Sequence, residues 1–239
     1  MRLDKYLANM DVGSRKEVKQ LIKKKRVAVN GKTEVSDKSQ VNEYEDRVTL
    51  DGDEIIYQKY FYYILNKPTD VISATVDDFE LTVLDIFSDQ DFRSDLFPVG
   101  RLDKDTKGLL IITNDGALSH RLLSPKKHVE KEYVAEVKGV MTTRDVERFN
   151  EGLKIDDDEL CLPAKLTIEQ VDEENEESTI RLVLHEGKYH QVKRMVHAVG
   201  KEVIQLKRIR MGALYLDDQL EAGDYRELTE EEIKLLENK

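Results

Sequence analysis

Residues 98–116, PVGRLDKDTKGLLIITNDG, place a carboxylate and a cation together at a glycine-marked turn. Asp103 follows Arg101 closely in this segment, and the apolar run 109–112 comes directly after it. An apolar run of this kind is typical of a buried strand, which would hold the turn rigidly. A carboxylate that is fixed beside a cation stays ionised and is suited to act as a nucleophile or a base. Asp103 is therefore the first candidate for chemistry.

The pattern GRLDxDTxGLLxxTNDG in this segment resembles the catalytic signature of the RsuA/RluB/E/F branch of the pseudouridine synthases. These enzymes isomerise uridine in ribosomal RNA, and the resemblance places their catalytic aspartate on Asp103. The same resemblance implies an active-site tyrosine at Tyr133, in EKEY, and a basic residue facing the aspartate at Lys193, in GKYHQVKRM. It leaves open whether Asp103 first attacks the ribose or removes a ribose proton.

Tyr133 and Lys193 are expected to have different roles. The ring of Tyr133 can stack on an extruded uracil and its hydroxyl can assist removal of the C5 proton, although strands also favour tyrosine in their core. Lys193 can pair with Asp103, but it cannot make the two-pronged contact of the arginine that many relatives carry there. The family members that act on small-subunit rRNA share this lysine. The alternative for Lys193 is an ordinary contact to the RNA backbone.

Other residues near the signature allow simpler interpretations. Arg101 either anchors the loop or fills the gap that a flipped base leaves in its stack, and we favour the second role. Leu110 packs under the uracil or belongs to the core, and Lys67 at a strand end is expected to be solvated. Gly100 and Gly108 bracket the aspartate and are expected to serve turn geometry. Isomerisation transfers no electrons and no outside group, so we expect neither cofactor nor metal; the five histidines show no familiar metal spacing.

Length and composition limit the class of protein. A chain of 239 residues can form one large domain or two unequal ones. It has no apolar run of about 18 residues, which a membrane span requires. Its first residues, MRLDKYLANM, do not resemble a signal peptide, and the single Cys161 excludes an internal disulfide. We expect a soluble, cytoplasmic, monomeric protein with no membrane partner.

The distribution of charge favours an RNA partner although the net charge is −11. The first 32 residues contain ten basic and three acidic side chains and carry +7, which leaves −18 on the rest. A basic head on an acidic body fits a protein that meets a polyanion with one face. The alternative is a solvated basic helix without a partner.

The basic head also resembles a known module. Two short helices, the second opened by the capping box Ser14–Glu17, precede the VAVNG strand and turn, and further strands are expected around Val41 and 48–50. This order resembles the S4-type RNA-binding module, which contacts phosphates and shape more than bases. The candidate RNA contacts in this module are Arg2, Lys5, Arg15, Lys16, Lys19 and Lys23.

The remaining sequence predicts an α+β domain with a mixed or antiparallel sheet, because its strands outnumber its helices without alternating with them. We place the S4-like module at residues 1–58 and the catalytic domain at 59–239. A helix over KYHQVKRMVHAVG and the strand after it carry a second basic patch, with Arg194 as a further candidate RNA contact. The acidic runs 156–160 and 172–177 are expected to be solvated turns.

These observations together favour an enzyme that converts one uridine of 16S rRNA to pseudouridine, in free RNA or in a partly assembled small subunit. The segments SPKKHVEKEY and EGKYHQVKRM are most similar to the members with that target. One alternative is a relative that modifies 23S rRNA, where an Arg-Arg pair is more frequent at 193–194. A non-catalytic ribosome assembly factor and an enzyme acting on another RNA, such as tRNA, are the others.

Overall fold

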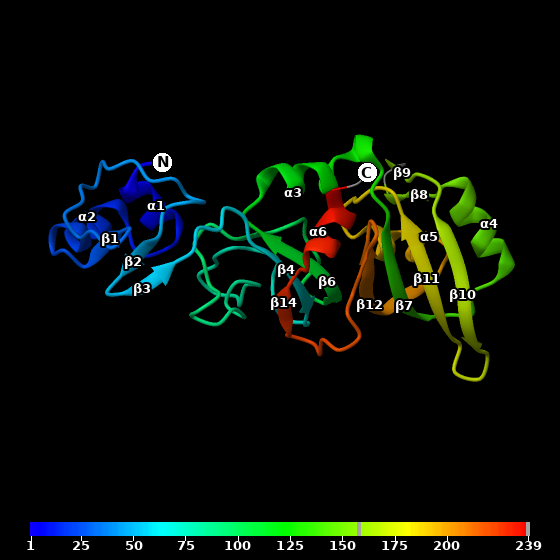
Figure 1. Cartoon of the computed structure of the whole chain (residues 1–239). Coiled ribbons are helices and arrows are strands. Elements are labelled where there is room, and N and C mark those ends of the chain that lie inside the picture. The colour runs from blue at the N-terminus through cyan, green and yellow to red at the C-terminus, as the bar shows by residue number, and fades with distance from the viewer. Residues whose placement is uncertain (157–158, 238–239) are drawn as a thin grey trace. The chain divides into compact units, whose positions relative to one another are not determined.

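The protein is described here by a computed structural model that covers residues 1–156 and 159–237 (Figure 1). The chain divides into two compact units, Met1–Tyr60 and Phe61–Lys239. The boundary that we expected, between residues 58 and 59, lies two residues before this division. Both units mix helices and strands, and the larger unit has a mixed sheet, so the predicted α+β class is confirmed.

The N-terminal unit packs two helices on a small antiparallel sheet. The expected capping box opens the second helix, where Ser14 Oγ accepts from the amide of Glu17 and the Glu17 carboxylate accepts from the amide of Ser14. The predicted strand around Val41 is not formed; Val41 instead lies buried in a loop. The elements of this unit are α1 (Leu3–Asn9), α2 (Arg15–Lys23), β1 (Val27–Val29), β2 (Val48–Leu50) and β3 (Asp53–Ile55).

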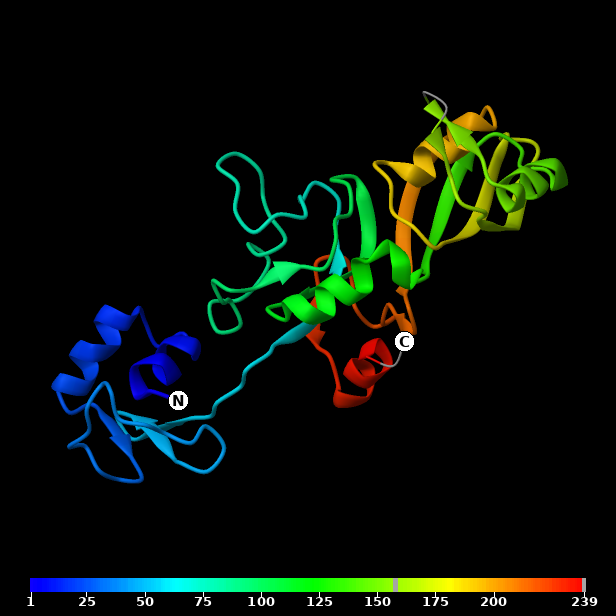
Figure 2. The ribbon, with the colours of Figure 1, turned by 90° about the horizontal axis from the view of Figure 1, so that it is seen from above.

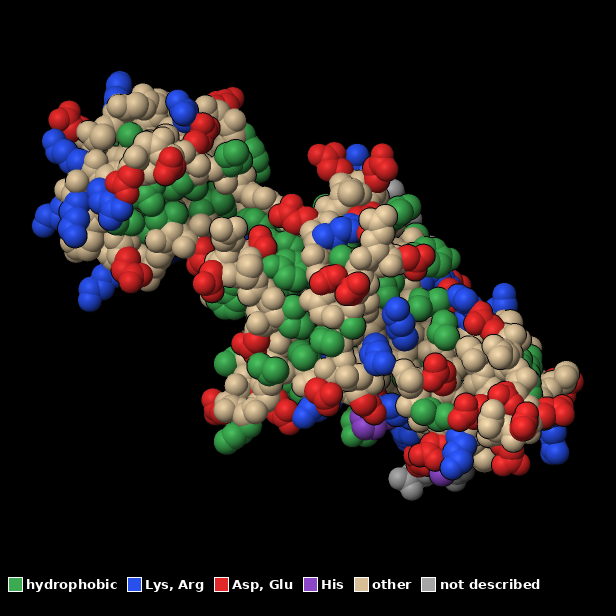
Figure 3. Space-filling model, turned by 90° about the horizontal axis from the view of Figure 1, so that it is seen from below, with side chains coloured by type: hydrophobic (Ala, Val, Ile, Leu, Met, Phe, Trp, Pro, Cys, Tyr) green, Lys and Arg blue, Asp and Glu red, His purple; other side chains and the backbone are tan. Residues whose placement is uncertain are grey.

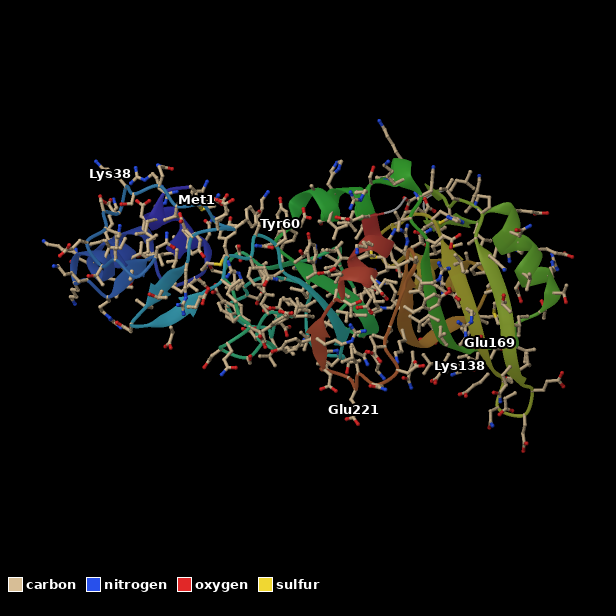
Figure 4. The ribbon with its side chains drawn as sticks, viewed as in Figure 1. Met1, Lys38, Tyr60, Lys138, Glu169 and Glu221 are labelled. Atoms are coloured by element: carbon tan, nitrogen blue, oxygen red, sulfur yellow. The ribbon has the colours of Figure 1, made fainter. Side chains whose placement is uncertain are left out.

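The larger unit is built on one twisted sheet, which Figure 2 shows from above. All its neighbouring strands are antiparallel except β12 and β6, which run parallel. Figure 4 labels Lys138, the last residue of β7, and Glu169, which lies at a bulge in β10. The strands, in spatial order, are β10 (Lys165–Asp172), β11 (Glu177–Leu184), β7 (Lys131–Lys138), β12 (Glu202–Met211), β6 (Thr106–Thr113), β4 (Tyr62–Lys67) and β14 (Tyr225–Glu227).

Shorter elements complete the described part of this unit. β13 pairs with β12, β5 pairs with β6, and β8 and β9 form a separate hairpin. No helix in the described ranges is long and apolar enough to span a membrane. The remaining elements are β5 (Phe97–Pro98), α3 (Gly116–Leu123), η1 (Pro125–Lys127), α4 (Thr143–Glu151), β8 (Lys154–Ile155), β9 (Glu159–Leu160), α5 (Gln191–Ala198), β13 (Leu214–Tyr215) and α6 (Glu230–Glu237).

Burial explains the strand sequences. Strand β6 is buried along nearly its whole length, and its residues 109–112 are all apolar, because both of its faces are covered. Helices α3 and α6 cover one face, through Leu118 and Leu236, and the loop segments 71–102 cover the other. Strand β11 alternates buried and half-exposed side chains, since only one of its faces is covered by α4 and α5.

The sheet brings the signature loop and α5 to the same face. Tyr133 of β7 packs against two core clusters, one beneath α5 and one beneath residues 71–102. Leu206 of β12 lies under α5 and is also the parallel partner of Thr106, the first residue of β6. The first turn of α5 therefore lies within reach of residues 100–105, which lead into β6.

Candidate active site

The loop 100–105 is held in place by Lys67, whose side chain is shielded from solvent. Lys67, at the end of β4, is fully buried, with 0% of its surface exposed. Its Nζ donates to the carbonyl oxygens of Pro68, Asp103, Lys104 and Thr106 at 2.9, 3.1, 3.3 and 3.0 Å. The expectation of a solvated strand-end lysine was wrong, because four carbonyl groups of the loop converge where its ammonium lies.

The charge state of Lys67 reflects this location. Burial lowers the pKa of Lys67 to about 8, and the carboxylates of Asp105, Asp103 and Asp70 oppose that shift. At neutral pH the side chain is still an ammonium, which supplies the hydrogens that the carbonyl oxygens need. Lys67 thus fixes the backbone at the candidate carboxylate and directly after it.

A second segment holds the loop from its other side. Ser73 Oγ donates to the carbonyl oxygen of Leu102 at 2.9 Å and accepts from its amide at 3.0 Å. The amide of Asp70 donates to the carbonyl oxygen of Lys104 at 2.9 Å. Because these bonds involve the backbone on either side of Asp103, they restrict the position of its side chain.

The Asp103 carboxylate faces two basic side chains from the start of α5. Lys193 Nζ lies 3.2 Å from Oδ2, and His190 Nε2 lies 3.5 Å from Oδ1. The Asp103 side chain keeps 28% of its surface exposed, so a substrate can reach it. The structure therefore brings together Asp103 and Lys193, which are 90 residues apart in the sequence.

Lys193 serves two carboxylates rather than one. Its Nζ donates to Oδ1 of Asp105 at 2.6 Å, which is shorter than its distance to Asp103. Burial disfavours the ammonium, but the hydrogen bonds to Asp105 and Asp103 outweigh it and raise the pKa of Lys193. The hydrogen bond from Lys193 in turn lowers the pKa of Asp105. Lys193 is consequently a lasting cation at the site.

Tyr133 lies on the sheet face that the loop and α5 share. It pairs with Arg208 of β12 across the sheet, and its half-buried ring contacts apolar side chains of both adjoining clusters. Within the described residues its hydroxyl makes no hydrogen bond. Leu110 of β6 is completely buried in the core beside it. The ring of Tyr133 is thus partly available while Leu110 is a core residue.

Gly108 allows strands β6 and β12 to approach each other closely and does not form a turn. It lies within β6 with φ of 104°, and a Cβ there would be 2.2 Å from the carbonyl oxygen of Arg208. The Arg208 guanidinium is itself buried and donates through Nε to the carbonyl oxygen of Leu109 at 2.8 Å. The parallel strands β6 and β12 can approach this closely only because residue 108 has no side chain.

The second basic patch that we expected around α5 is largely paired with acidic side chains. Arg194 contacts Asp156 and Glu159 at 2.9 and 3.0 Å, and its Nη1 also donates to the carbonyl oxygen of Tyr189. The run 156–160 was expected to be solvated, yet its described acidic residues hold these cations; residues 157 and 158 lie outside the described ranges. Three further pairs repeat this arrangement: Lys188 with Glu159, Lys201 with Asp145, and Arg210 with Glu130 and Glu132.

The run 172–177 behaves as expected, since residues 173–176 form the turn between β10 and β11. Arg101 is exposed, and within the described residues it makes no hydrogen bond or ion pair. The side chain of Arg101 is therefore accessible to a substrate beside the loop. This placement gives Arg101 no anchoring contact.

The basic side chains of α2 contrast with those of α5. Arg15, Lys16 and Lys23 are exposed, and no acidic group in the described part of the chain lies within 4.0 Å of them. Lys19 lies 3.5 Å from Asp37, and Arg2 pairs with Asp4 at 2.7 Å, while Lys5 is exposed. Figure 3 shows Lys and Arg side chains gathered along one edge of the N-terminal unit.

Sequence reasoning missed three residues of the site. Lys67 was placed in solvent because a sequence does not show where loop carbonyls converge. Asp105 lies in the signature itself, and its spacing from Asp103 could have suggested a second partner for the same cation. His190 lies three residues before Lys193, a helical spacing that brings side chains to one face.

Comparison with known proteins agrees with this geometry. Residues 61–198 match the family described as RNA pseudouridylate synthase, and residues 1–55 match the S4 domain. The first match covers more than half of the chain and contains every residue that contacts the Asp103 carboxylate. An S4 domain followed by a mixed-sheet domain with this site defines an RNA-modifying enzyme.

Relatives and a solved structure extend over nearly the whole chain. An uncharacterised RNA pseudouridine synthase of Bacillus subtilis is 47% identical and covers 99% of this chain and 98% of its own. Ribosomal small subunit pseudouridine synthase A of Vibrio vulnificus is 42% identical and covers 98% of both chains. Ribosomal large subunit pseudouridine synthase B of Bacillus subtilis is 39% identical over 98% of this chain and 95% of its own.

A crystal structure of a pseudouridylate synthase covers 99% of both chains with a TM-score of 0.67 and 33% identity. The chain belongs to the RNA pseudouridylate synthase family. It is an isomerase that acts on RNA.

Proposed function

We propose that this protein converts one uridine of 16S rRNA to pseudouridine and that Asp103 is its catalytic carboxylate. The observation that supports this most strongly is the position of Asp103, which faces Lys193 at 3.2 Å on a loop that Lys67 holds rigidly. A carboxylate that is fixed beside a lasting cation is suited to act at the ribose as nucleophile or base. The reaction needs no cofactor, since the atoms of uridine are only rearranged.

Other residues support the same reaction in defined roles. The half-buried ring of Tyr133 would stack on the extruded uracil, and its free hydroxyl would assist removal of the C5 proton. Arg101, exposed before the loop, would fill the gap that the flipped nucleotide leaves. The N-terminal unit would hold the RNA by its phosphates through the candidate residues Arg2, Lys5, Arg15, Lys16, Lys19 and Lys23.

The free side chains of α2 are the strongest of these RNA contacts, whereas Arg194 has the weakest case because two carboxylates already occupy its guanidinium. A cation that is neutralised within the protein gains less from a phosphate than a solvated one. We expect Arg194 to contribute to RNA binding only if the RNA displaces Asp156 or Glu159. The protein would act as a monomer in the cytoplasm, where ribosomal RNA is its substrate.

The choice between 16S and 23S rRNA as the substrate depends on Lys193 and on the relatives that are named for the small and the large ribosomal subunit. Small-subunit enzymes at 38–42% identity support 16S rRNA as the target. The large-subunit enzyme of Bacillus subtilis, at 39%, supports 23S rRNA as the second candidate. Lysine at position 193 favours 16S rRNA, because the resemblance to the small-subunit branch of the family includes this lysine.

Tritium release distinguishes these targets. The protein is incubated with 16S and 23S transcripts that carry tritium at C5 of uridine, free or partly assembled with ribosomal proteins, and the released tritium is counted. We expect release from 16S rRNA that reaches one equivalent per transcript. Release from 23S rRNA alone would replace the proposed target with the second candidate.

The role of Asp103 is tested with a matched pair of variants. Asp103→Asn removes the charge with almost no change in shape, so tritium release should fall by at least about a thousandfold while RNA affinity changes little. Asp218→Asn, at an exposed position between β13 and β14, should behave as the unmodified protein. Full activity in Asp103→Asn would show that another carboxylate carries the reaction.

A further inference from the structure

The two oxygens of the Asp103 carboxylate have different partners. Lys193 Nζ approaches Oδ2 at 3.2 Å, and His190 Nε2 approaches Oδ1 at 3.5 Å. An arginine could hold both oxygens with one planar fork, but a lysine is a point charge and holds one. His190 therefore lies against the oxygen that Lys193 leaves open.

The carboxylates in direct contact with Lys193 outnumber it, since the ammonium of Lys67 lies against backbone carbonyls of the loop and not against either carboxylate. The loop presents two carboxylates, Asp103 and Asp105, and Lys193 is the single lysine that contacts both. Lys193 also lies nearer to Asp105, at 2.6 Å, than to Asp103. A neutral imidazole leaves this group of side chains with one net negative charge, and a protonated imidazole leaves it with none.

Within the described residues, the other cations of this segment have acidic partners of their own. On its own segment, Lys188 pairs with Glu159, and Arg194 pairs with Glu159 and Asp156. From the loop, Asp103 and Asp105 face it, and the His190 charge adds to those that lower the pKa of Asp105.

The backbone and the neighbouring ring hold His190 in place. Its φ of 46° and ψ of 35° put it in the left-handed region, an uncommon conformation for a residue that is not glycine, just before α5. Such a conformation is energetically unfavourable and is found preferentially at functional sites. The ring stacks on Tyr189 with centroids 3.8 Å apart and planes 20° from parallel. The amide of Arg194 donates to its carbonyl oxygen at 3.0 Å.

We propose that His190 is a positioning residue for Asp103, which holds the carboxylate oxygen that Lys193 leaves open and, when protonated, completes the charge balance of the site. This inference rests on the proposed catalytic role of Asp103. His190 acts through that carboxylate and not on the substrate, so it should affect the rate of the chemical step more than RNA binding.

The test compares two substitutions of His190 in the full-length protein. His190→Asn removes the cation, and asparagine tolerates the left-handed conformation. His190→Arg keeps a positive charge at every pH of the experiment. His197→Asn, an exposed position on the same helix, is the matched control. Single-turnover tritium release at saturating RNA is measured from pH 5.5 to pH 8.5, together with the Kd for RNA.

The expected result is a pH-dependent loss. His190→Asn should slow the reaction roughly fivefold at pH 6 and less than about twofold at pH 8.5, since histidine side chains in general change charge within this range. His190→Arg should match the unmodified protein at pH 6 and show a weaker dependence on pH. Both should bind RNA with an unchanged Kd, and His197→Asn should behave as the unmodified protein throughout.

Three outcomes would overturn the inference. The first is an equal loss of rate in His190→Asn at both pH values. The second is a raised Kd for RNA with an unchanged rate at saturation, which would mark His190 as a phosphate contact. The third is a rate in His190→Arg at pH 6 that is as low as that of His190→Asn. The Asp103→Asn variant separates this inference from the one on which it rests. An active Asp103→Asn would refute the catalytic role of Asp103, whereas an inactive one with unaffected His190 variants refutes only the positioning role.

Discussion

Two basic regions of this protein have similar residue types and different surroundings. On α2, Arg15, Lys16 and Lys23 are exposed without an acidic partner within the described residues. Around α5, in contrast, Lys193 and Arg194 each contact two carboxylates. A count of lysines and arginines would rate the two regions as equal RNA-binding surfaces. The contacts of these side chains distinguish the two regions.

This difference distinguishes cations that are free to bind RNA from cations that hold other side chains of the protein in position. A free lysine that meets a phosphate releases the counterions of the RNA, which makes binding depend on salt. A lysine already paired with a carboxylate offers less of that gain, because the pair must first be broken. We therefore expect substitutions on α2 to affect RNA affinity and substitutions around α5 to affect rate or stability.

The largest effect should come from Lys193, the cation at the proposed catalytic carboxylate. Lys193→Gln leaves Asp103 and Asp105 close together without their shared ammonium, so the rate at saturating RNA should fall about a hundredfold. The Kd for RNA should change less than about threefold, since Lys193 is already engaged. Single-turnover tritium release and filter binding measure the two quantities.

Lys193→Arg is the matched control for this prediction. It keeps the charge, so it should retain most of the rate that glutamine loses. A large rise in Kd for Lys193→Gln with a normal rate at saturation would instead assign Lys193 to the RNA backbone. It would also remove the contrast between the two basic regions.

The next effect concerns Lys67, a cation that is paired with no carboxylate but with backbone carbonyls. Lys67→Met keeps the length of the side chain and leaves four carbonyl oxygens without their donor. The free energy of unfolding should fall by about 2–3 kcal/mol. The rate should fall by a factor on the order of 30–100, because the loop that carries Asp103 is no longer held. Chemical denaturation and tritium release measure both.

The lowered pKa of Lys67 also predicts a dependence of stability on pH. Its pKa is about 8 in the folded protein against an ordinary value of 10.5, so between these values the unfolded chain binds the extra proton. The free energy of unfolding therefore gains up to about 1.4 kcal/mol per pH unit in this range from Lys67. Lys67→Met should lose this contribution. Lys131, which burial also brings to a pKa of about 8, keeps its own in both proteins.

Features that depend on neighbouring residues could be predicted from the sequence. The capping box at Ser14 is formed as expected, because it needs only residues three positions apart. The strand 109–112 and the α5 helix could be predicted for the same reason. The signature motif also located Asp103, and family resemblance supplied Lys193 as its partner.

Features that depend on tertiary structure could not be predicted in this way. The burial of Lys67 requires four carbonyls from two segments, and only the folded loop shows where they meet. The role of Gly108 requires β12, which lies almost a hundred residues later, to pass against it. The pairing of Arg194 with Asp156 likewise joins segments that the sequence shows only as separate basic and acidic runs.

A smaller effect on rate, with a clear effect on affinity, is expected on α2. The triple variant Arg15→Gln, Lys16→Gln, Lys23→Gln removes three free cations, so the Kd for RNA should rise roughly tenfold or more at physiological salt. The slope of log Kd against log salt should decrease by about 2–3, close to one per lost phosphate contact. The rate at saturating RNA should be unchanged. An unchanged salt slope would show that α2 does not contact phosphates.

The smallest effect is expected for the same kind of substitution around α5. The double variant Lys188→Gln, Arg194→Gln removes two cations that Asp156 and Glu159 already neutralise. The salt slope should stay within about half a unit of that of the unmodified protein, since almost no additional counterion is released there. The midpoint of thermal unfolding should fall slightly, because the carboxylates lose their partners. A salt slope reduced as much as in the α2 triple variant would mean that RNA displaces these carboxylates, and Arg194 would then be an RNA contact after all.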